Sequence, residues 1–165
     1  MVGPEADVCC ASLSCWLGIV FIPQGRQSFQ MTFSGAKLAL FLGRDLLVIL
    51  RDDKVDIPYP GHWDLPGGGR EGSETPSDCA LRETYEEVGL QLQKQDLIWE
   101  REYTRPRGQV WFFVTRQPTS LVDLIRFGSE GQCWKLMPPR EYCAHPLAVP
   151  HFAQRLGEYL DESEI

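Results

Sequence analysis

The segment GGGREGSETPSDCALRETYEEVGL, which runs from Gly67 to Leu90, constrains this chain more than any other. It places Glu83, Glu86 and Glu87 within five residues. Because an α-helix turns by about 100° per residue, side chains three and four positions apart share a face. Like charges at this spacing destabilise an isolated helix by roughly 0.2–0.5 kcal/mol per pair. A helix built on this segment therefore needs a partner that offsets the repulsion.

Signals at both ends of the segment predict where the helix starts and stops. Thr75 is a good N-cap, Pro76 suits the first helical position, and Asp78 lies where a capping box closes. Gly89 supplies a C-terminal stop. The predicted core-facing stripe consists of Ala80, Leu81, Thr84 and Val88. The acidic side chains thus fall on a different face from the apolar ones.

A hard divalent cation would offset the repulsion between the glutamates. Oxygen ligands without histidine or thiolate favour Mg²⁺ or Mn²⁺ over zinc. Gly67, Gly68 and Gly69 precede the helix and let the backbone approach a bound group closely. Mg²⁺ in proteins commonly combines carboxylates with substrate phosphates. On physical grounds alone, two interpretations remain open: a Mg²⁺–phosphate site and an acidic, solvated helix face.

The overall composition is that of one globular domain. The chain has 165 residues, 43% of them hydrophobic, which is enough to bury a core. Its net charge of −7 argues against a protein whose main partner is a nucleic acid. The six cysteines include no C-x-x-C pair, and three of them crowd into the first fifteen residues. Free thiols in a reducing cytoplasm are therefore favoured over a zinc site or a disulfide framework.

The first thirty residues stand apart from the rest. They contain an uncharged apolar run, but Glu5 and Asp7 precede it where a secretory signal needs basic residues. A membrane span needs about 20 apolar residues, and Pro23 ends this run early. We therefore predict that residues 1–30 form an extension peripheral to a domain at 31–165, without insertion into a membrane.

Apolar patterning further along the chain predicts a mixed sheet. Alternating or fully apolar runs between turn residues are typical of strands, and a period of 3.6 is typical of helices. Strands are predicted at Ala36–Gly43, Asp45–Asp53, His62–Leu65, Leu97–Thr104, Val110–Arg116 and Gln132–Met137. A second helix is predicted at Val149–Leu160. The order β-β-β-α-β-β-β-α without repeats predicts an α+β fold with helices packed on a mixed sheet.

The segment resembles the Nudix box, G-x5-E-x7-R-E-U-x-E-E-x-G-U, in which U is a bulky apolar residue. Its fixed positions are filled in order and without a gap by Gly68, Glu74, Arg82, Glu83, Glu86, Glu87, Gly89 and Leu90. Thr84 departs from the aliphatic residue that the pattern prefers, although its methyl group can still face the core. With the lead-in WDLPGG, the resemblance covers roughly Ala36 to Leu160. It implies the Nudix fold, an α-β-α sandwich with a mixed β-sheet between helices.

The resemblance implies a Mg²⁺-dependent hydrolase of the MutT-like kind, with Mn²⁺ as an alternative cation. Nudix proteins typically cut the pyrophosphate of a nucleoside diphosphate linked to another moiety, so a (d)NTP or a nucleotide conjugate is the expected small-molecule partner. The commonest soluble assembly is a homodimer. The alternative function is a catalytically inactive nucleotide-sensing module. Such a module would be expected to lose box glutamates, whereas this sequence keeps all four.

The resemblance also implies a metal site and its organisation. The carboxylates of Glu83, Glu86 and Glu87, with the carbonyl of Gly68, would bind Mg²⁺. Arg82 would orient these carboxylates by ion pairing. The number of metal ions and the identity of the substrate are not specified by the box, because recognition of the base or sugar comes from residues outside it.

Three further residues receive roles from the same resemblance. Glu74 and Gly89 would maintain the geometry of the loop and the helix. The general base is left open between Glu83 and Glu130. The latter lies in the segment GSEGQCW, Gly128 to Trp134, which resembles a later loop that carries the base in some family members. Glu130 is thus assigned as a general base or an additional metal ligand, and a surface turn is the alternative.

Other side chains carry weaker signals. Arg51, Lys54, Arg105 and Arg107 are candidates for phosphate contacts, although exposed basic residues commonly serve solvation alone. For the aromatic residues at strand positions, packing in the core is favoured over stacking on a base. These aromatic residues are Trp63, Trp111, Phe112 and Phe113.

Overall fold

The computed structural model describes residues 33–106 and 108–163, and the prediction for residues 1–30 lies outside this part of the chain. The strands are β1 (Phe33–Leu42), β2 (Asp45–Leu50), β3 (Trp63–Asp64), β4 (Gly67–Gly69), β5 (Leu97–Arg105), β6 (Gly108–Gln117) and β7 (Cys133–Met137). The α-helices are α1 (Pro76–Val88), α2 (Pro139–Ala144) and α3 (Pro150–Ser163), and the 3₁₀ turns are η1 (Lys94–Asp96) and η2 (Thr119–Leu124).

In the described part of the chain, seven strands form one mixed sheet. Its main path is β3-β2-β1-β6-β5, with β4 paired to β1 and β7 paired to β2. β1 runs antiparallel to β2 and β4 but parallel to β6. A parallel pair needs a long crossover connection, and α1 lies in the stretch of chain that connects β1 to β6. The box helix is therefore part of the connection that builds the centre of the sheet.

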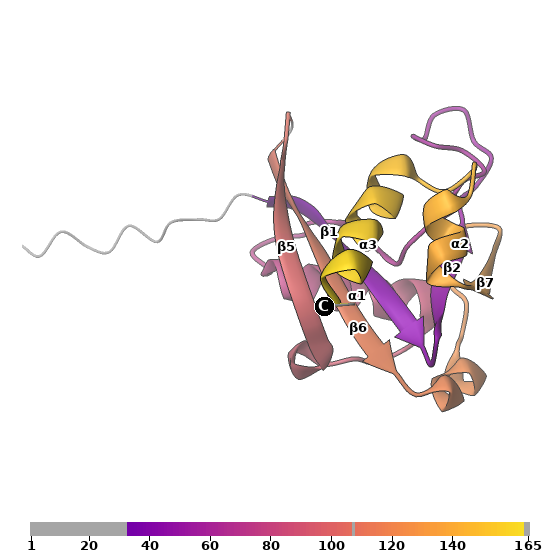
Figure 1. Cartoon of the computed structure of the whole chain (residues 1–165). Coiled ribbons are helices and arrows are strands. Elements are labelled where there is room, and N and C mark those ends of the chain that lie inside the picture. Colours follow the sequence, from indigo (N-terminus) through magenta and orange to yellow (C-terminus); the bar gives the residue numbers. More distant parts are fainter. Residues whose placement is uncertain (1–32, 107, 164–165) are drawn as a thin grey trace, which may run out of the picture. The chain divides into compact units, whose positions relative to one another are not determined.

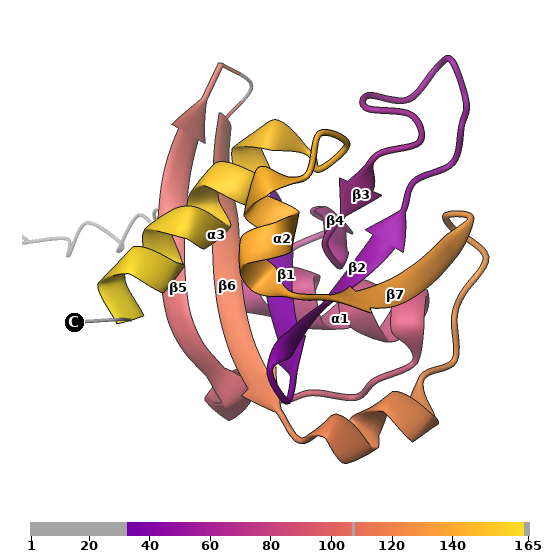
Figure 2. The same ribbon diagram turned by 45° about the vertical axis from the view of Figure 1, so that its right-hand side comes forward.

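Alternate residues of β1 serve two separate cores. Leu38, Leu40 and Leu42 pack on the α1 side, whereas Ala39 and Phe41 pack on the side of α2 and α3. Successive strand residues point to opposite faces, and a strand covered on both faces reads as a continuous apolar run. Figures 1 and 2 show α1 on one face of the sheet and α3 across the other. The α-β-α sandwich predicted from the sequence is confirmed.

The helix α1 forms with the caps that the sequence predicts. The Oγ1 of Thr75 accepts from the backbone N–H of Asp78 at 3.3 Å, and Pro76 is the first helical residue. Gly89 follows the helix with φ at 72°, and its N–H donates to the Tyr85 carbonyl at 2.8 Å. This left-handed conformation is readily adopted by glycine alone. The acidic face of α1 is thus fixed at both ends.

One residue of the predicted apolar stripe is wrong. Ala80, Thr84 and Val88 are buried, but Cys79 is buried where Leu81 was expected, and Leu81 is only partly covered. The hydroxyl of Thr84, the residue that departs from the box pattern, donates to the Ala80 carbonyl at 2.7 Å. A buried hydroxyl that is hydrogen-bonded within its own helix costs little. The departure therefore leaves the packing of α1 intact.

All six predicted strands and the second predicted helix agree with the structure apart from their ends. The predicted strand from Asp45 to Asp53 stops at Leu50, where the chain leaves the sheet and returns at β3. The short elements β4 and α2 were not predicted, because three and six residues are too few to show a period. In the residues that the structure describes, no helix is long and apolar enough to cross a membrane.

Candidate functional site

Arg82 organises the acidic face of α1. Its Nε and Nη2 donate to the two carboxylate oxygens of Glu74 at 3.0 and 2.9 Å. Its Nη1 lies 2.9 Å from both Glu83 Oε1 and Glu86 Oε2, and Nη2 also donates to the carbonyl of Gly69 at 3.0 Å. Paired, charge-assisted contacts of this kind fix geometry as well as adding stability. One guanidinium thus ties the glycine loop to α1 and offsets the repulsion between two of the three glutamates.

The ionisation of Glu74 reflects these contacts. Hydrogen bonds from Arg82 lower the pKa of Glu74 to about 2. The same hydrogen bonds raise the pKa of Arg82 above its already high value. Glu74 also accepts from the backbone N–H of Glu71 at 2.7 Å. The pair is therefore ionised at every physiological pH and holds the turn before the helix.

The glycine loop lies directly against Glu83. A Cβ at Gly68 would overlap the Glu83 carboxylate, and a Cβ at Gly67 would collide with the carbonyl of Ala36. Gly67 also has φ at 124°, where side chains are strained. Burial raises the pKa of Glu83, although the hydrogen bond from Arg82 acts in the opposite direction. The lack of side chains in the loop is thus what lets backbone and carboxylate meet.

The loop backbone also binds Glu87. Its Oε2 accepts from the N–H of Gly67 at 2.8 Å. Burial raises the pKa of Glu87 to about 7, and the charge of Lys37 opposes that rise. A raised carboxyl pKa means that the charged form lacks compensation in its surroundings. A cation bound beside Glu87 would supply that compensation.

The donor set fits a hard divalent cation by its chemistry. Glu83 and Glu87 are oxygen donors with raised pKa values, and such donors suit Mg²⁺ or Mn²⁺. The carbonyl of Gly68 faces α1, 3.7 Å from the Cys79 sulfur. In residues 33–106 and 108–163, no three His, Cys, Asp or Glu side chains gather closely enough to hold a metal ion. Arg82 instead engages two of the three glutamates, including the exposed Glu86.

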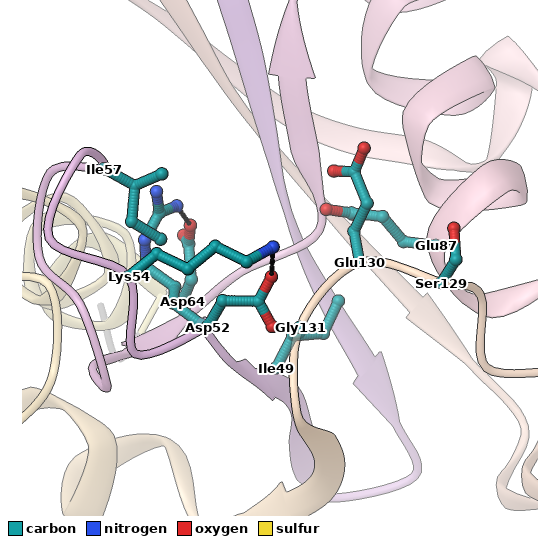
Figure 3. A pocket seen from close by; sticks show the side chains of 10 residues that line it. Ile49, Asp52, Lys54, Ile57, Asp64, Glu87, Ser129, Glu130 and Gly131 are labelled. Atoms are coloured by element: carbon teal, nitrogen blue, oxygen red, sulfur yellow. Dashed lines mark hydrogen bonds and ion pairs between the residues drawn. The ribbon is translucent and has the colours of Figure 1, made fainter.

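A cavity of about 300 Å³ opens beside Glu87. We call it the carboxylate cavity, and its charged lining residues are Arg51, Asp52, Lys54, Asp64, Glu87 and Glu130. Figure 3 shows the carboxylate of Glu130, from the loop before β7, close to that of Glu87 from α1. Lys54 binds Asp52 and Arg51 binds Asp64, each at 2.6 Å. Once these pairs are formed, Glu87 and Glu130 leave the cavity with an excess of negative charge.

Asp64, on β3, is a residue of this site that the sequence analysis missed. It is 3% exposed, and its Oδ2 lies 3.0 Å from Lys37 Nζ and 2.6 Å from Arg51 Nη1. Lys37 also donates to the carbonyl of Leu65 at 2.8 Å. Buried charges in proteins are paired, so an aspartate inside the apolar lead-in WDLPGG was a signal that basic partners lie nearby.

A second cavity, of about 380 Å³, shares Arg51 and Asp64 with the first. We call it the cationic cavity, and the lining residues of interest are Lys37, Arg51, Tyr59, Asp64, Arg105 and His151. Burial, and then the charge of Arg105, lower the pKa of His151 to about 4, so this imidazole is neutral at pH 7. Three basic side chains therefore face one acid. The walls carry net positive charge in a chain whose total is −7.

The residues with weaker sequence signals differ in where they lie in the structure. Phe112 and Phe113 are fully buried, which confirms core packing. Trp111 is partly buried and stacks on Phe113 with ring centroids 5.9 Å apart, and Trp63 packs against the α3 side of the core. Arg107 lies outside the described residues. These aromatic side chains thus contribute mainly to packing.

Relatives in sequence match about half of the chain. A diphosphoinositol polyphosphate phosphohydrolase 3-beta from Homo sapiens is 52% identical over 94 residues, which cover 52% of this chain and 57% of that protein. An RNA pyrophosphohydrolase from Cereibacter sphaeroides is 26% identical over 119 residues, which cover 59% of this chain and 71% of that protein. The chain thus spans little more than half the length of the diphosphoinositol relatives.

A solved structure and a family model extend the likeness over most of the domain. The MutT protein from Methanosarcina mazei superposes with a TM-score of 0.64 at 17% identity, over 79% of this chain and 94% of that one, which shows a shared fold. The model of the NUDIX domain matches residues 33–157. Because that match covers well over half of the chain, this protein belongs to the Nudix family.

Proposed function

We propose that this protein is a Mg²⁺-dependent hydrolase that cleaves a pyrophosphate bond in a nucleotide-type substrate, with Mn²⁺ able to replace Mg²⁺. One observation carries the proposal. Glu87, whose pKa is raised by burial, joins the glycine loop to a cavity that Glu130 also lines. Perturbed carboxylates beside a cavity are typical of sites that handle a cation or a proton.

The proposed metal ligands are the carboxylates of Glu83, Glu86 and Glu87 and the carbonyl of Gly68. When bound, Mg²⁺ would neutralise charge on the phosphoryl oxygens and make a water molecule more acidic. Arg82 positions two of these carboxylates through its ion pairs. Its hydrogen bond to the loop keeps the carbonyl side of the loop beside α1.

Glu130 is our candidate for the general base. It lines the carboxylate cavity beside Glu87 and is exposed to solvent, so a proton taken from water can leave by that route. Glu83, the other candidate, has one oxygen held by Arg82 at 2.9 Å. That oxygen is therefore less available to accept a proton from water.

The names of the relatives support hydrolysis of a diphosphate. One relative is a diphosphoinositol polyphosphate phosphohydrolase and another is an RNA pyrophosphohydrolase. Both names describe a substrate that joins a phosphorylated group to a further phosphate. The retention of all four box glutamates favours hydrolysis over nucleotide sensing without chemistry.

A substrate panel with and without Mg²⁺ tests the proposal. The panel contains (d)NTPs, 8-oxo-dGTP, ADP-ribose, NADH, dinucleoside polyphosphates, capped RNA and a diphosphoinositol polyphosphate, with phosphate or nucleotide release as the readout. We expect turnover of at least one compound with Mg²⁺ and none with EDTA. Tight binding without turnover of any compound would instead identify a sensing module.

Two further expectations belong to this proposal. We place the enzyme in the cytoplasm, since Cys79, Cys133 and Cys143 are free thiols in the described part of the chain. We also expect a homodimer. Fractionation of cells and light scattering of the purified protein measure these two properties directly.

A further inference from the structure

A third cavity, of about 120 Å³, adjoins the cationic cavity. Lys37, Arg105 and Phe152 line both of them. Arg155 and Gly68 also line the smaller cavity, so it reaches the glycine loop of the box. Its charged lining residues are three bases and no acid among the residues that the structure describes. We call the two cavities together the cationic groove.

Arg155 is buried in this groove, and no carboxylate from the described residues is in contact with it. It is 5% exposed, and its guanidinium lies 4.2 Å from the ring centroid of Tyr103 and 5.6 Å from that of Phe152. Burial, and then the charge of Arg105, lower the pKa of Arg155 to about 10, which leaves it charged at neutral pH. Glu158 acts on it weakly and is itself hydrogen-bonded to Tyr103 at 2.6 Å. A buried charge without a direct partner is stabilised when a counter-ion binds.

Other donors along the groove share an acceptor or have none. Lys37 and Arg51 share the single carboxylate of Asp64. The buried Nε of Arg51 and the buried Nε1 of Trp111, which lines the smaller cavity, have no hydrogen-bond partner in the described part of the chain. Nearly all buried donors in folded proteins are paired. The groove therefore lacks the acceptors that a bound anion would supply.

We propose that the cationic groove binds a phosphate group of the substrate that is not hydrolysed, with Lys37, Arg105 and Arg155 as its cationic contacts. A phosphate group fits because it carries both the charge and several acceptor oxygens that guanidinium groups recognise. A neutral base or sugar would add no counter-charge for Arg155, and Lys37 would still share one carboxylate with Arg51.

This inference rests on the proposed function and narrows its substrate class. The carboxylate cavity and the cationic groove share Arg51 and Asp64, so they lie on either side of one wall. A substrate that spans this wall carries a pyrophosphate at one end and a further phosphate at the other. The class is thus a polyphosphorylated compound rather than a nucleoside diphosphate with a neutral partner.

Isothermal titration calorimetry in EDTA at low ionic strength tests the groove without catalysis. The probes are myo-inositol hexakisphosphate, which has no pyrophosphate bond, and ADP. The variants are Arg105→Gln at an exposed groove position, Arg105→Lys, which keeps the charge, and Arg44→Gln, which removes an exposed charge from the turn between β1 and β2. Thermal unfolding checks that every variant is folded.

We expect Arg105→Gln to weaken binding of the hexakisphosphate by roughly 10- to 100-fold, which is the effect of losing a charged hydrogen bond. Arg105→Lys should retain most of the affinity, and Arg44→Gln should bind like the wild type. An equal loss for ADP would identify a nucleotide phosphate as the group bound, and a loss for the hexakisphosphate alone would identify ring phosphates. Wild-type affinity of Arg105→Gln for both probes, or no binding by the wild type, would overturn the subsite. If binding depends on these charges but no substrate is hydrolysed, the phosphate subsite is supported and the proposed hydrolase function is contradicted.

Discussion

The carboxylate cavity and the cationic groove are neighbours with opposite charge. They share Arg51 and Asp64, yet acidic side chains outnumber basic ones in the first and basic ones outnumber acidic ones in the second. The net charge of −7 for the whole chain therefore does not describe the charge of either region. The sign of the electrostatic potential is therefore set locally, by the strands, helices and loops that contribute charged side chains to each cavity.

The two regions also differ in how far the fold satisfies their polar groups. On the acidic side, Arg82 contacts three glutamates and Gly67 donates to Glu87. On the basic side, Arg155 has no carboxylate in contact and the Nε1 of Trp111 has no acceptor within residues 33–106 and 108–163. The polar groups of the acidic side are thus largely satisfied by the protein itself, whereas the basic side keeps donors that a phosphate would satisfy under our proposal.

The largest expected effect is on catalysis at the acidic side. Glu87→Gln should lower kcat by about 1,000-fold, because a neutral amide is a poor ligand for a hard cation. The same change should leave the free energy of unfolding equal or raise it by about 1 kcal/mol, since burying a charge is costly. Steady-state kinetics and urea unfolding measure both, with Glu100→Gln on the exposed face of β5 as the control. Normal turnover by Glu87→Gln would remove the metal site from the acidic face.

The next effect concerns the wall between the two regions. Asp64→Asn should lower the free energy of unfolding by about 3 kcal/mol, because it leaves two partly buried cations without their carboxylate. Asp52→Asn, which breaks a pair with the exposed Lys54, should cost much less. Urea unfolding of both variants gives the comparison. Equal losses of unfolding free energy in the two variants would show that Asp64 stabilises the fold no more than an exposed ion pair does.

A smaller effect is expected from the candidate base. Glu130→Gln should lower kcat by about 100-fold, as expected for loss of general base catalysis. Glu102→Gln, at an exposed position on β5, should leave kcat unchanged in steady-state kinetics. An unchanged kcat for Glu130→Gln would assign this residue to a surface turn.

The smallest effect is on stability in acid. The pKa of Glu74 lies near 2 in the folded protein and is ordinarily near 4.5, so its contribution is complete above pH 4.5 and is lost as the pH falls toward 2. We expect this contribution to be about 1–2 kcal/mol after allowing for partial exposure of the pair. Urea unfolding at pH 6 and at pH 3 should show a smaller decrease for Glu74→Gln than for the wild type. An identical decrease would mean that Arg82 is held by its other partners.

The helix α1 and its acidic face could be predicted from the sequence, whereas the gathering of the basic side chains could not, for a physical reason. The glutamates of α1 and of the turn before it come from one continuous segment, so helix periodicity and caps such as Thr75 and Gly89 place them. The basic side gathers Lys37, Arg105 and Arg155 from β1, β5 and α3, which are brought together by strand pairing and by packing across the sheet. No local sequence pattern indicates that residues so far apart in the chain lie together in the fold.

The position of Asp64 has a consequence for selectivity. Its strand is hydrogen-bonded to β2, with Ile49 opposite Asp64, and the backbone of Trp63 also bonds to Leu147 and Val149. Asp64, which lines both regions, is thus held by the backbone pairing of the sheet. Under our proposal, the protein would then select substrates by the distance between their charged groups. A compound whose charged groups are separated by a different distance would bind in only one of the two regions. Substrates would therefore be discriminated by their length as well as by their chemical groups.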